Sequence, residues 1–366
     1  MLDIEITERQ LLDQFLEALR ELPDVQVELG LRQQYEGTDR GYDACVDLWA
    51  GGKPVTLQIE VKKSLYPRDV RQNLWQLEDY ASRWPQSERG GQTSYFLVAH
   101  SISPGAKHLM RDKRVGYYDS GGSMFLPAEN IYVYVDKPPP KALSRSIRSL
   151  YSGRRSRVLH ALLMRPDEWF GVRELAELAF VSPATVSQVL KELEKYDWVN
   201  SRGQGPTKKR YLQEPDALLD EWTKQLELMR PPAIKRYYVP SVHVEGLLLK
   251  FAKVCNAHKA EYAITHEAAA QWYAPFLSTF SQVRCRMVAG APADAVLEEL
   301  DAHKVNHGAN LTVIPVKSSD ELLFRKLENG IWLASSVQVY LDLMRSEGRA
   351  KEMANHLRKE RNEFQW

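Results

Sequence analysis

The sequence is poor in cysteine and has no long apolar run. Its 366 residues include three cysteines, Cys45, Cys255 and Cys285, and this small, odd and widely spaced set argues against a disulfide framework and favours a reducing cytoplasm. No apolar run approaches the roughly 20 residues that a membrane-spanning helix requires. The first residues, Met-Leu-Asp-Ile-Glu-Ile, lack the basic-then-apolar pattern of a signal peptide. We therefore expect a cytoplasmic protein with no membrane partner.

The chain also has almost no net charge, +1 at pH 7, but this small value conceals an asymmetry. Residues 141–213 contain 14 Lys and Arg against 7 Asp and Glu, a net charge of +7, so the rest of the chain carries +1 minus +7, or −6. A basic middle inside an otherwise acidic chain indicates a polyanionic partner for that middle. The alternative is a solvated basic connector.

The length and two proline clusters predict an α/β multidomain protein. At about 150 residues per domain the chain should form two or three domains. Pro138–Pro140 cannot continue a helix or a central strand, and Pro231-Pro232 marks a second break. The predicted parts are an α/β domain over 1–136, a basic Pro/Ser linker over 137–153, a helical domain over 154–232 and a C-terminal α/β domain over 233–366.

The first domain is expected to start with a helix and continue with strands. Thr7 can cap that helix together with Gln10, and apolar residues follow at helical spacing up to Pro23. The remaining expected elements are a strand over 25–29, a hairpin over 43–63, a helix over 68–84, a strand over 94–100 and a second hairpin over 124–126 and 131–135.

The hairpin over 43–63 carries the residues that we single out for chemistry. Two alternating runs flank Gly51-Gly52, a turn signal. Asp43 and Asp47 share one face of the first strand, and Glu60 and Lys62 share one face of the second, because side chains alternate along a strand. Carboxylates gathered in this way are suited to a divalent cation such as Mg²⁺.

Asp47, followed thirteen residues later by Glu60-Val61-Lys62, resembles the motif of the PD-(D/E)xK restriction-endonuclease-like superfamily. The resemblance covers roughly residues 1–136 and implies a restriction-endonuclease-like fold with a Mg²⁺ (or Mn²⁺) site that cuts DNA. By this resemblance Asp47 and Glu60 would hold the metal and Lys62 would assist. Asp43 competes with Asp47, which the spacing to Glu60 favours, and Glu28 is a further candidate ligand. The alternative is an ion-paired scaffold without activity.

Short helices and a basic hairpin follow the proline break. Helices are expected over 158–163 and 172–179, and a third is capped by Ser182 with Pro183 at its first position. Residues 198–212 then form a β-hairpin with a Gly-rich turn. This succession resembles a winged helix-turn-helix over about 55 residues. A protein-protein module is the alternative, but the net charge favours duplex DNA.

The winged-helix resemblance indicates which side chains would contact DNA. Outward positions at the start of a recognition helix meet base edges, and basic residues of the wing grip phosphates. The predicted base-reading residues of the third helix, beside Ala184, are Thr185, Ser187, Gln188 and Lys191. The predicted phosphate-binding residues of the hairpin are Arg202, Lys208, Lys209 and Arg210.

The C-terminal domain resembles part of another family. The segments 262–270, 331–336 and 340–343 are similar to the C-terminal region of type IV antitoxins of the AbiEi family, winged-helix repressors whose last domain looks like a nucleotidyltransferase fold. No Gly-Ser followed by paired Asp is found, so we expect no transferase activity.

Two functions therefore stay open. One is a duplex-DNA-binding protein with a Mg²⁺-dependent nuclease-like domain, and the other is an antitoxin-like transcriptional regulator whose nuclease-like domain is inactive. A homodimer, and a toxin or other protein partner for the C-terminal domain, stay open as well.

Overall fold

The computed structural model describes residues 7–29, 43–50, 53–83, 92–128, 130–241, 243–276 and 279–360. The chain has an α/β fold and divides into two compact units by its internal contacts. The first unit comprises residues 1–147 with 192–197, and the second comprises residues 148–191 with 198–366. The boundary at 147 lies inside the predicted linker over 137–153.

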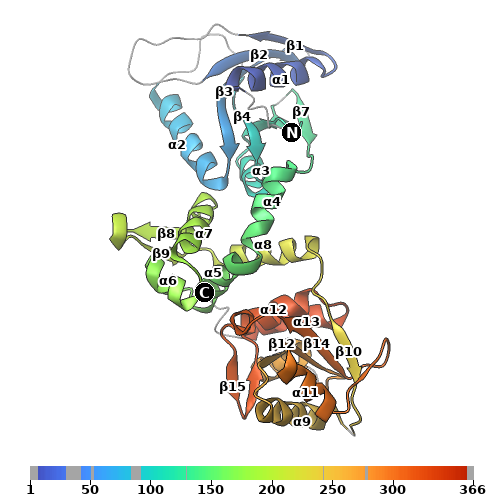
Figure 1. Ribbon diagram of the computed structural model, residues 1–366. Coiled ribbons are helices and arrows are strands. Elements are labelled where there is room, and N and C mark those ends of the chain that lie inside the picture. The colour runs from blue at the N-terminus through green and yellow to red at the C-terminus, as the bar shows by residue number, and fades with distance from the viewer. Residues whose placement is uncertain are drawn as a thin grey trace. The chain divides into compact units, whose positions relative to one another are not determined.

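The first unit is built on a mixed seven-stranded sheet in which the strands lie in chain order (Figure 1). The central pairs β3–β4 and β4–β5 are parallel, and the outer pairs are antiparallel. The strands are β1 (Val25–Leu29), β2 (Ala44–Ala50), β3 (Lys53–Leu65), β4 (Gln92–Ile102), β5 (Gly116–Asp119), β6 (Met124–Pro127) and β7 (Tyr132–Val135). The helices are α1 (Glu8–Arg20), α2 (Pro67–Arg83) and α3 (Pro104–Asp112).

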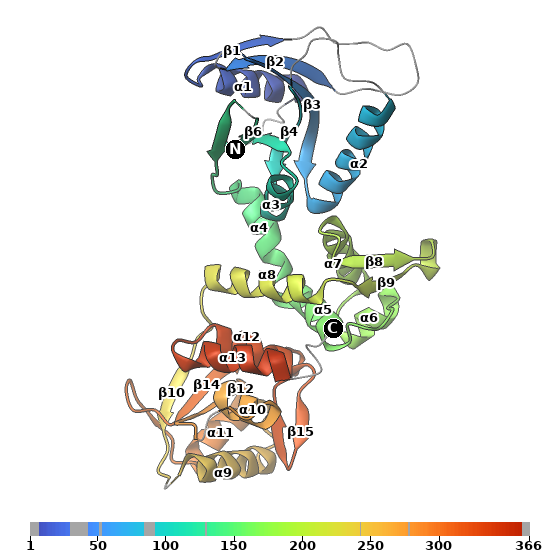
Figure 2. The ribbon, with the colours of Figure 1, turned by 180° about the vertical axis from the view of Figure 1, so that it is seen from behind.

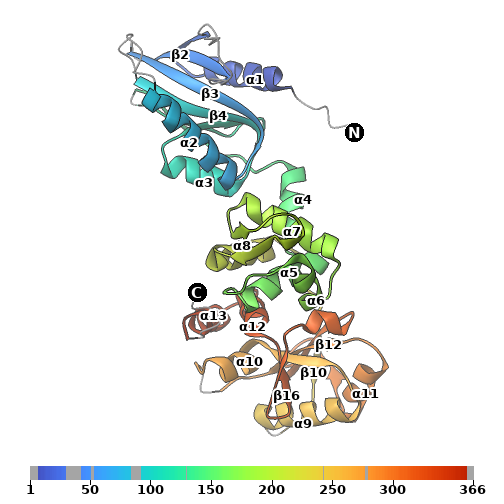
Figure 3. The same cartoon turned by 90° about the vertical axis from the view of Figure 1, so that its left-hand side faces the viewer.

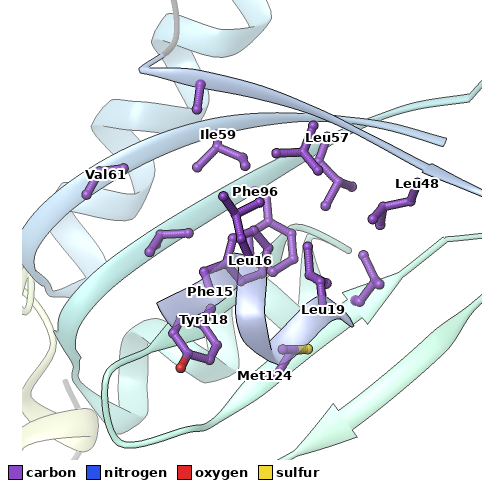
Figure 4. Packing of buried hydrophobic residues seen from close by; sticks show 14 of the residues in the cluster. Phe15, Leu16, Leu19, Leu48, Leu57, Ile59, Val61, Phe96, Tyr118 and Met124 are labelled. Carbon is purple, nitrogen blue, oxygen red and sulfur yellow. The ribbon is translucent and has the colours of Figure 1, made fainter. Parts of the chain in front are cut away.

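Two apolar cores cover the two faces of this sheet. On one face α1 packs Phe15 and Leu19 against residues of β2, β3 and β4 (Figure 4), and the ring of Phe15 stacks on Phe96 at a centroid distance of 4.5 Å. On the other face Val70 of α2 and Met110 of α3 join a second core. The two buried faces fix the register of the sheet, because a slip by one residue would expose every apolar side chain.

Most of the expected elements of the first unit are confirmed. Thr7 caps α1 as predicted, since its side chain accepts from the amide of Gln10 at 3.3 Å. The strand over 25–29 and both hairpins are present, although the turn residues 51 and 52 lie outside the described residues. The helix α3 and the strand β5 were not predicted from the sequence. The predicted linker is also partly helical, as α4 covers Lys141–Leu150.

The second unit begins with two helices, most of a third and a two-stranded hairpin; residues 192–195 at the end of the third helix are counted with the first unit. The helices are α5 (Gly153–Met164), α6 (Val172–Leu178) and α7 (Pro183–Lys195), and the strands are β8 (Val199–Arg202) and β9 (Lys209–Leu212). A short 3₁₀ turn, η1 (Gly205–Thr207), lies between the strands, and the helix α8 (Pro215–Leu228) follows them. Leu159, Leu162, Val189 and Leu190 are fully buried, so the helices enclose a common core.

The rest of the second unit is a mixed seven-stranded sheet between two layers of helices (Figures 2 and 3). The strand order is β13-β10-β14-β12-β11-β16-β15. These strands are β10 (Lys235–Tyr238), β11 (Tyr262–Thr265), β12 (Val283–Val288), β13 (His303–Lys304), β14 (Leu311–Val316), β15 (Lys326–Glu328) and β16 (Ile331–Leu333). One layer contains α9 (Val244–Ala257) and α11 (Ala291–Glu299); the other contains α10 (His266–Tyr273), α12 (Ser336–Met344) and α13 (Arg349–Glu360).

Polar contacts join the three helices to this sheet domain within the second unit. His160 of α5 is buried, and its Nε2 lies 2.7 Å from Oγ of Ser335, the cap of α12. Arg157 pairs with Asp320, which lies in the 3₁₀ turn η2 (Ser319–Leu322), at 2.8 Å. Burial, followed by the charge of Arg286, lowers the pKa of His160 to about 3, so this imidazole is neutral in the folded protein.

No helix in the described part of the chain is long and apolar enough to cross a membrane.

Candidate functional site

Polar and apolar side chains alternate along β2 and β3. The polar positions are half-buried and the apolar ones are buried in the core under α1. Leu97 and Ala99, the register partners of Glu60 and Lys62 on β4, belong to the opposite core under α2 and α3. Paired residues of neighbouring strands share a face, so Glu60 and Lys62 lie on the side of the sheet that carries α2 and α3.

The register of the hairpin selects Asp43 rather than Asp47 as the neighbour of Glu60. Ala44 pairs with Ile59, and the amide of Asp43 donates to the carbonyl of Ile59 at 2.9 Å, which puts Asp43 opposite Glu60. Asp47 instead pairs with Thr56. Four residues of strand, about 13 Å at 3.3 Å per residue, separate Asp47 from the position opposite Glu60.

The prediction that Asp47 and Glu60 hold one metal ion is therefore corrected. The side chain of Asp47 accepts a hydrogen bond from Thr56 Oγ1 at 2.6 Å, and on its other side Asp47 pairs with Glu28 of β1. Glu28 is exposed, so this second acidic pair lies at another part of the sheet than Glu60. Linear spacing favoured Asp47, but antiparallel pairing decides which carboxylates meet.

Asp43, Glu60 and Lys62 form a compact group. Oδ2 of Asp43 accepts from the amide of Val61 at 2.8 Å, which holds the carboxylate over the sheet. Nζ of Lys62 donates to Oε1 of Glu60 at 2.5 Å. Burial and the charge of Asp43 raise the pKa of Glu60, against the opposing effect of Lys62. Two carboxylates are thus held together at a place where their charges disfavour each other.

This pair of carboxylates fits a divalent cation. Among the described residues, the carboxylates of Asp43 and Glu60 each have one oxygen engaged and make no other hydrogen bond. Mg²⁺ is commonly held by one or two carboxylates, with water and phosphate oxygens completing its six positions. A search of the described part of the chain finds no group of three or more His, Cys, Asp or Glu that could hold a metal ion. Any cation here would rest on the two carboxylates and on non-protein oxygens.

The outward side of α7 carries the four residues that were predicted to read bases. Gln188 and Lys191 are exposed, and Thr185 and Ser187 are half-exposed. Thr185 also takes part in the cap of α7, since its amide donates to Ser182 Oγ at 3.3 Å. Nη2 of Arg155 donates to Oε1 of Gln188 at 3.2 Å, so a second cation lies beside this surface.

The four basic residues of the hairpin that were predicted to bind phosphates differ in how far they are exposed to solvent. Arg202 and Lys209 are exposed and Lys208 is half-buried. Arg210 is only 7% exposed, and its backbone exchanges two hydrogen bonds with Phe170, at 2.8 and 2.9 Å. Its assignment as a phosphate-binding residue is therefore corrected, because the alternation of β9 turns its side chain inward.

An aromatic side chain, which the sequence did not predict to be there, lies beside the hairpin. The guanidinium of Arg202 lies 4.2 Å from the centroid of the Trp169 ring, which orients the arginine on the surface. Trp169 lies outside the predicted elements, and an isolated tryptophan next to a basic hairpin carries no signal of such a contact.

Two buried ionic networks are present that the sequence did not predict. In the first unit, Nζ of Lys107 lies 2.9 Å from Asp119 and 2.7 Å from Oγ of Ser123. In the second, Asp342 receives Arg286 at 2.5 Å and the hydroxyl of Thr265 at 2.6 Å. Both networks are closed by their own partners, so we assign them to stability. The sequence does not indicate which acidic residue a buried lysine or arginine pairs with, because the partner lies at a distant position of the chain.

No protein-family model matches the chain, and no curated protein matches it.

Proposed function

We propose that the protein binds duplex DNA and cuts it at a Mg²⁺-dependent site of the PD-(D/E)xK kind in the first unit. The observation that supports this best is the pairing of Asp43 with Glu60 on adjacent strands, with Lys62 two residues further on the same face. A cytoplasmic location is part of the proposal and is supported by the small and odd number of cysteines, Cys45, Cys255 and Cys285.

The chain's own residues have distinct roles in this proposal. Asp43 and Glu60 would hold the cation, which when bound neutralises charge on the phosphate and lowers the pKa of a bound water. Lys62 would donate a hydrogen bond to the water or to a phosphate oxygen. The amide of Val61 keeps Asp43 oriented, so the site does not depend on a flexible carboxylate.

Binding of duplex DNA is assigned to the three helices and the hairpin of the second unit, as a winged helix-turn-helix. The supporting observation is that Gln188 and Lys191 of α7 are exposed together with Lys209 and Arg202 of the hairpin. Gln188 could pair with an adenine, and the basic residues could bind phosphates and make the affinity depend on salt. A protein-binding module of the same shape would not need these cations.

One observation favours the second candidate, an antitoxin-like transcriptional regulator with an inactive first domain. The ammonium of Lys62 is engaged with Glu60 at 2.5 Å, as in an ion-paired scaffold. The segments that resemble AbiEi antitoxins meet in the C-terminal sheet domain, where Ile264 pairs with Leu333 and Thr265 bonds to Asp342. A homodimer and a toxin or other protein partner belong to this candidate.

Incubation with plasmid distinguishes the two candidates. The full chain should nick or cut plasmid in the presence of Mg²⁺ or Mn²⁺, and Glu60→Ala and Lys62→Ala should each abolish the cutting. Equal cutting by the wild type and both variants would assign the activity to a contaminant. The absence of cutting over a broad range of salt, pH and metal would favour the regulator.

DNA binding is tested separately in EDTA by fluorescence anisotropy on duplex DNA. Arg202→Ala and Lys209→Ala should each weaken binding and reduce the slope of log K against log salt by about 1, since each removes one of the predicted phosphate contacts. Arg165→Ala is the matched control, because Arg165 is an exposed arginine outside α7 and the hairpin. Equal slopes for all three variants would reject the assignment.

A further inference from the structure

A pocket of about 820 Å³ lies in the second unit between α5, α6, the start of α7 and the turn η2. Its walls include three arginines, Arg154, Arg157 and Arg173, and the ring of Phe180. The pocket is open to solvent along much of its extent, and its volume is enough for one small molecule that keeps one side exposed. The sequence did not suggest this site, because its residues are spread from position 154 to position 320.

Two of the three arginines are available to a ligand. Within the described part of the chain, neither Arg154 nor Arg173 makes a hydrogen bond or an ion pair, and both are exposed. Arg157 donates to Asp320 at 2.8 Å. Glu177 is the other acidic wall residue, so the pocket has a surplus of positive charge. Guanidinium groups bind phosphate oxygens with two parallel hydrogen bonds, which makes a phosphorylated ligand the best match.

Phe180 adds an apolar requirement. Its ring is 67% exposed and its backbone has φ of +50°, a left-handed conformation that a bulky residue rarely adopts. Phe180 is the second residue after the end of α6, a position where glycine is usual, and the amide of Val181 donates to the carbonyl of Ala176 at 3.0 Å. A phenylalanine here is unfavourable both for the backbone and for solvation, which a stacking partner in the pocket would offset.

We infer that this pocket binds a nucleoside diphosphate, with the phosphates on Arg154 and Arg173 and the base against Phe180. Duplex DNA fits less well, because its bases are stacked away from such a ring and because Asp320 and Glu177 would repel its continuous backbone. The positive end of α7, which begins at Pro183 on the wall, adds to the attraction for a phosphate. The inference does not depend on the proposed nuclease or on DNA binding.

Isothermal titration of the full chain with ADP, in EDTA and without DNA, tests the inference. ADP should bind at one site, and Arg154→Ala and Arg173→Ala should each weaken it at least ten-fold. Asp320→Asn should instead tighten it about three-fold or more, because it removes a negative wall charge and frees Arg157. Arg165→Ala should leave the affinity unchanged.

Phe180→Gly separates the ring from the phosphates. Glycine relieves the left-handed backbone, so the variant should fold at least as well as the wild type. It should lower the affinity for ADP to that for inorganic pyrophosphate, whose own binding should not change. The inference is overturned if millimolar ADP does not bind, if the arginine variants bind as the wild type does, if Phe180→Gly leaves ADP binding unchanged, or if only duplex DNA responds to the arginine substitutions.

Discussion

Exchanging Asp43 for asparagine should slow cleavage strongly, whereas the same exchange at Asp47 should not. Asp43 is opposite Glu60 across the hairpin, while Asp47 lies about 13 Å further along the strand at 3.3 Å per residue. A Mg²⁺ ion contacts its ligands at about 2.1 Å and cannot join carboxylates so far apart. Losing one of two protein ligands should cost about 3 kcal/mol of transition-state stabilisation, a slowing of roughly 150-fold.

The assay is the initial rate of plasmid nicking at fixed Mg²⁺, with Asp43→Asn and Asp47→Asn compared under the same conditions. Asp47→Asn should cut within about three-fold of the wild type, because an asparagine oxygen can still accept the hydrogen bond of Thr56. Both variants are of equal size and charge change, so general destabilisation or loss of charge predicts equal effects. A rate that falls with Asp47→Asn and survives Asp43→Asn would refute the assignment based on register.

Three further predictions concern stability in urea denaturation. Lys107→Met should lower the free energy of unfolding by about 3–5 kcal/mol, because it leaves Asp119 buried and unpaired; a loss below about 1 kcal/mol would contradict the buried pairing. The pKa of His160 is lowered to about 3 in the folded protein, so the stability that the neutral imidazole contributes is complete above pH 6.5 and is lost on acidification. Between pH 7 and pH 5 the free energy of unfolding of the wild type should fall by about 2 kcal/mol more than that of His160→Asn. Parallel pH profiles of the two proteins would show that His160 is not desolvated. The pKa of Glu60 is raised, so the stability that its protonated form contributes is present at low pH and is lost as the pH rises through that pKa. Glu60→Gln should therefore have a larger free energy of unfolding than the wild type at pH 7, and the difference should disappear in acid. A variant that is less stable than the wild type at pH 7 would indicate that the ion pair with Lys62 dominates.

Helices and strands were predicted best where the spacing of the apolar residues and the flanking turn residues indicated the same element. The strand over 25–29 and the hairpin over 43–63 alternate strictly and are bounded by turn residues, and both are present. The helix α3 was missed because it is short and buries Lys107, a residue that a pattern of apolar positions treats as solvent-facing. Its partner Asp119 lies twelve residues further on, and only the folded sheet brings the two charges together.

The candidate metal site could have been predicted more closely than it was. If the sequence signal at Gly51-Gly52 is taken as a two-residue turn, Ala50 is predicted to pair with Lys53, as the structure has it. Counting back along both strands then predicts Asp43 opposite Glu60. Counting along the chain led to Asp47 instead. The inward orientation of the Arg210 side chain could also have been predicted from the alternation of side chains along β9. The pocket around Arg154 and Phe180 could not have been predicted, because its residues are distant in the sequence and come together only when the helices pack.

Calorimetric titration of the full chain with Mn²⁺, without DNA, tests most directly whether Asp43 and Glu60 hold a cation. The wild type and Asp47→Asn should each bind one ion, and Asp43→Asn and Glu60→Gln should show no measurable binding. Binding that is lost with Asp47→Asn but kept by the other two variants, or the absence of binding by the wild type at millimolar Mn²⁺, would contradict this assignment.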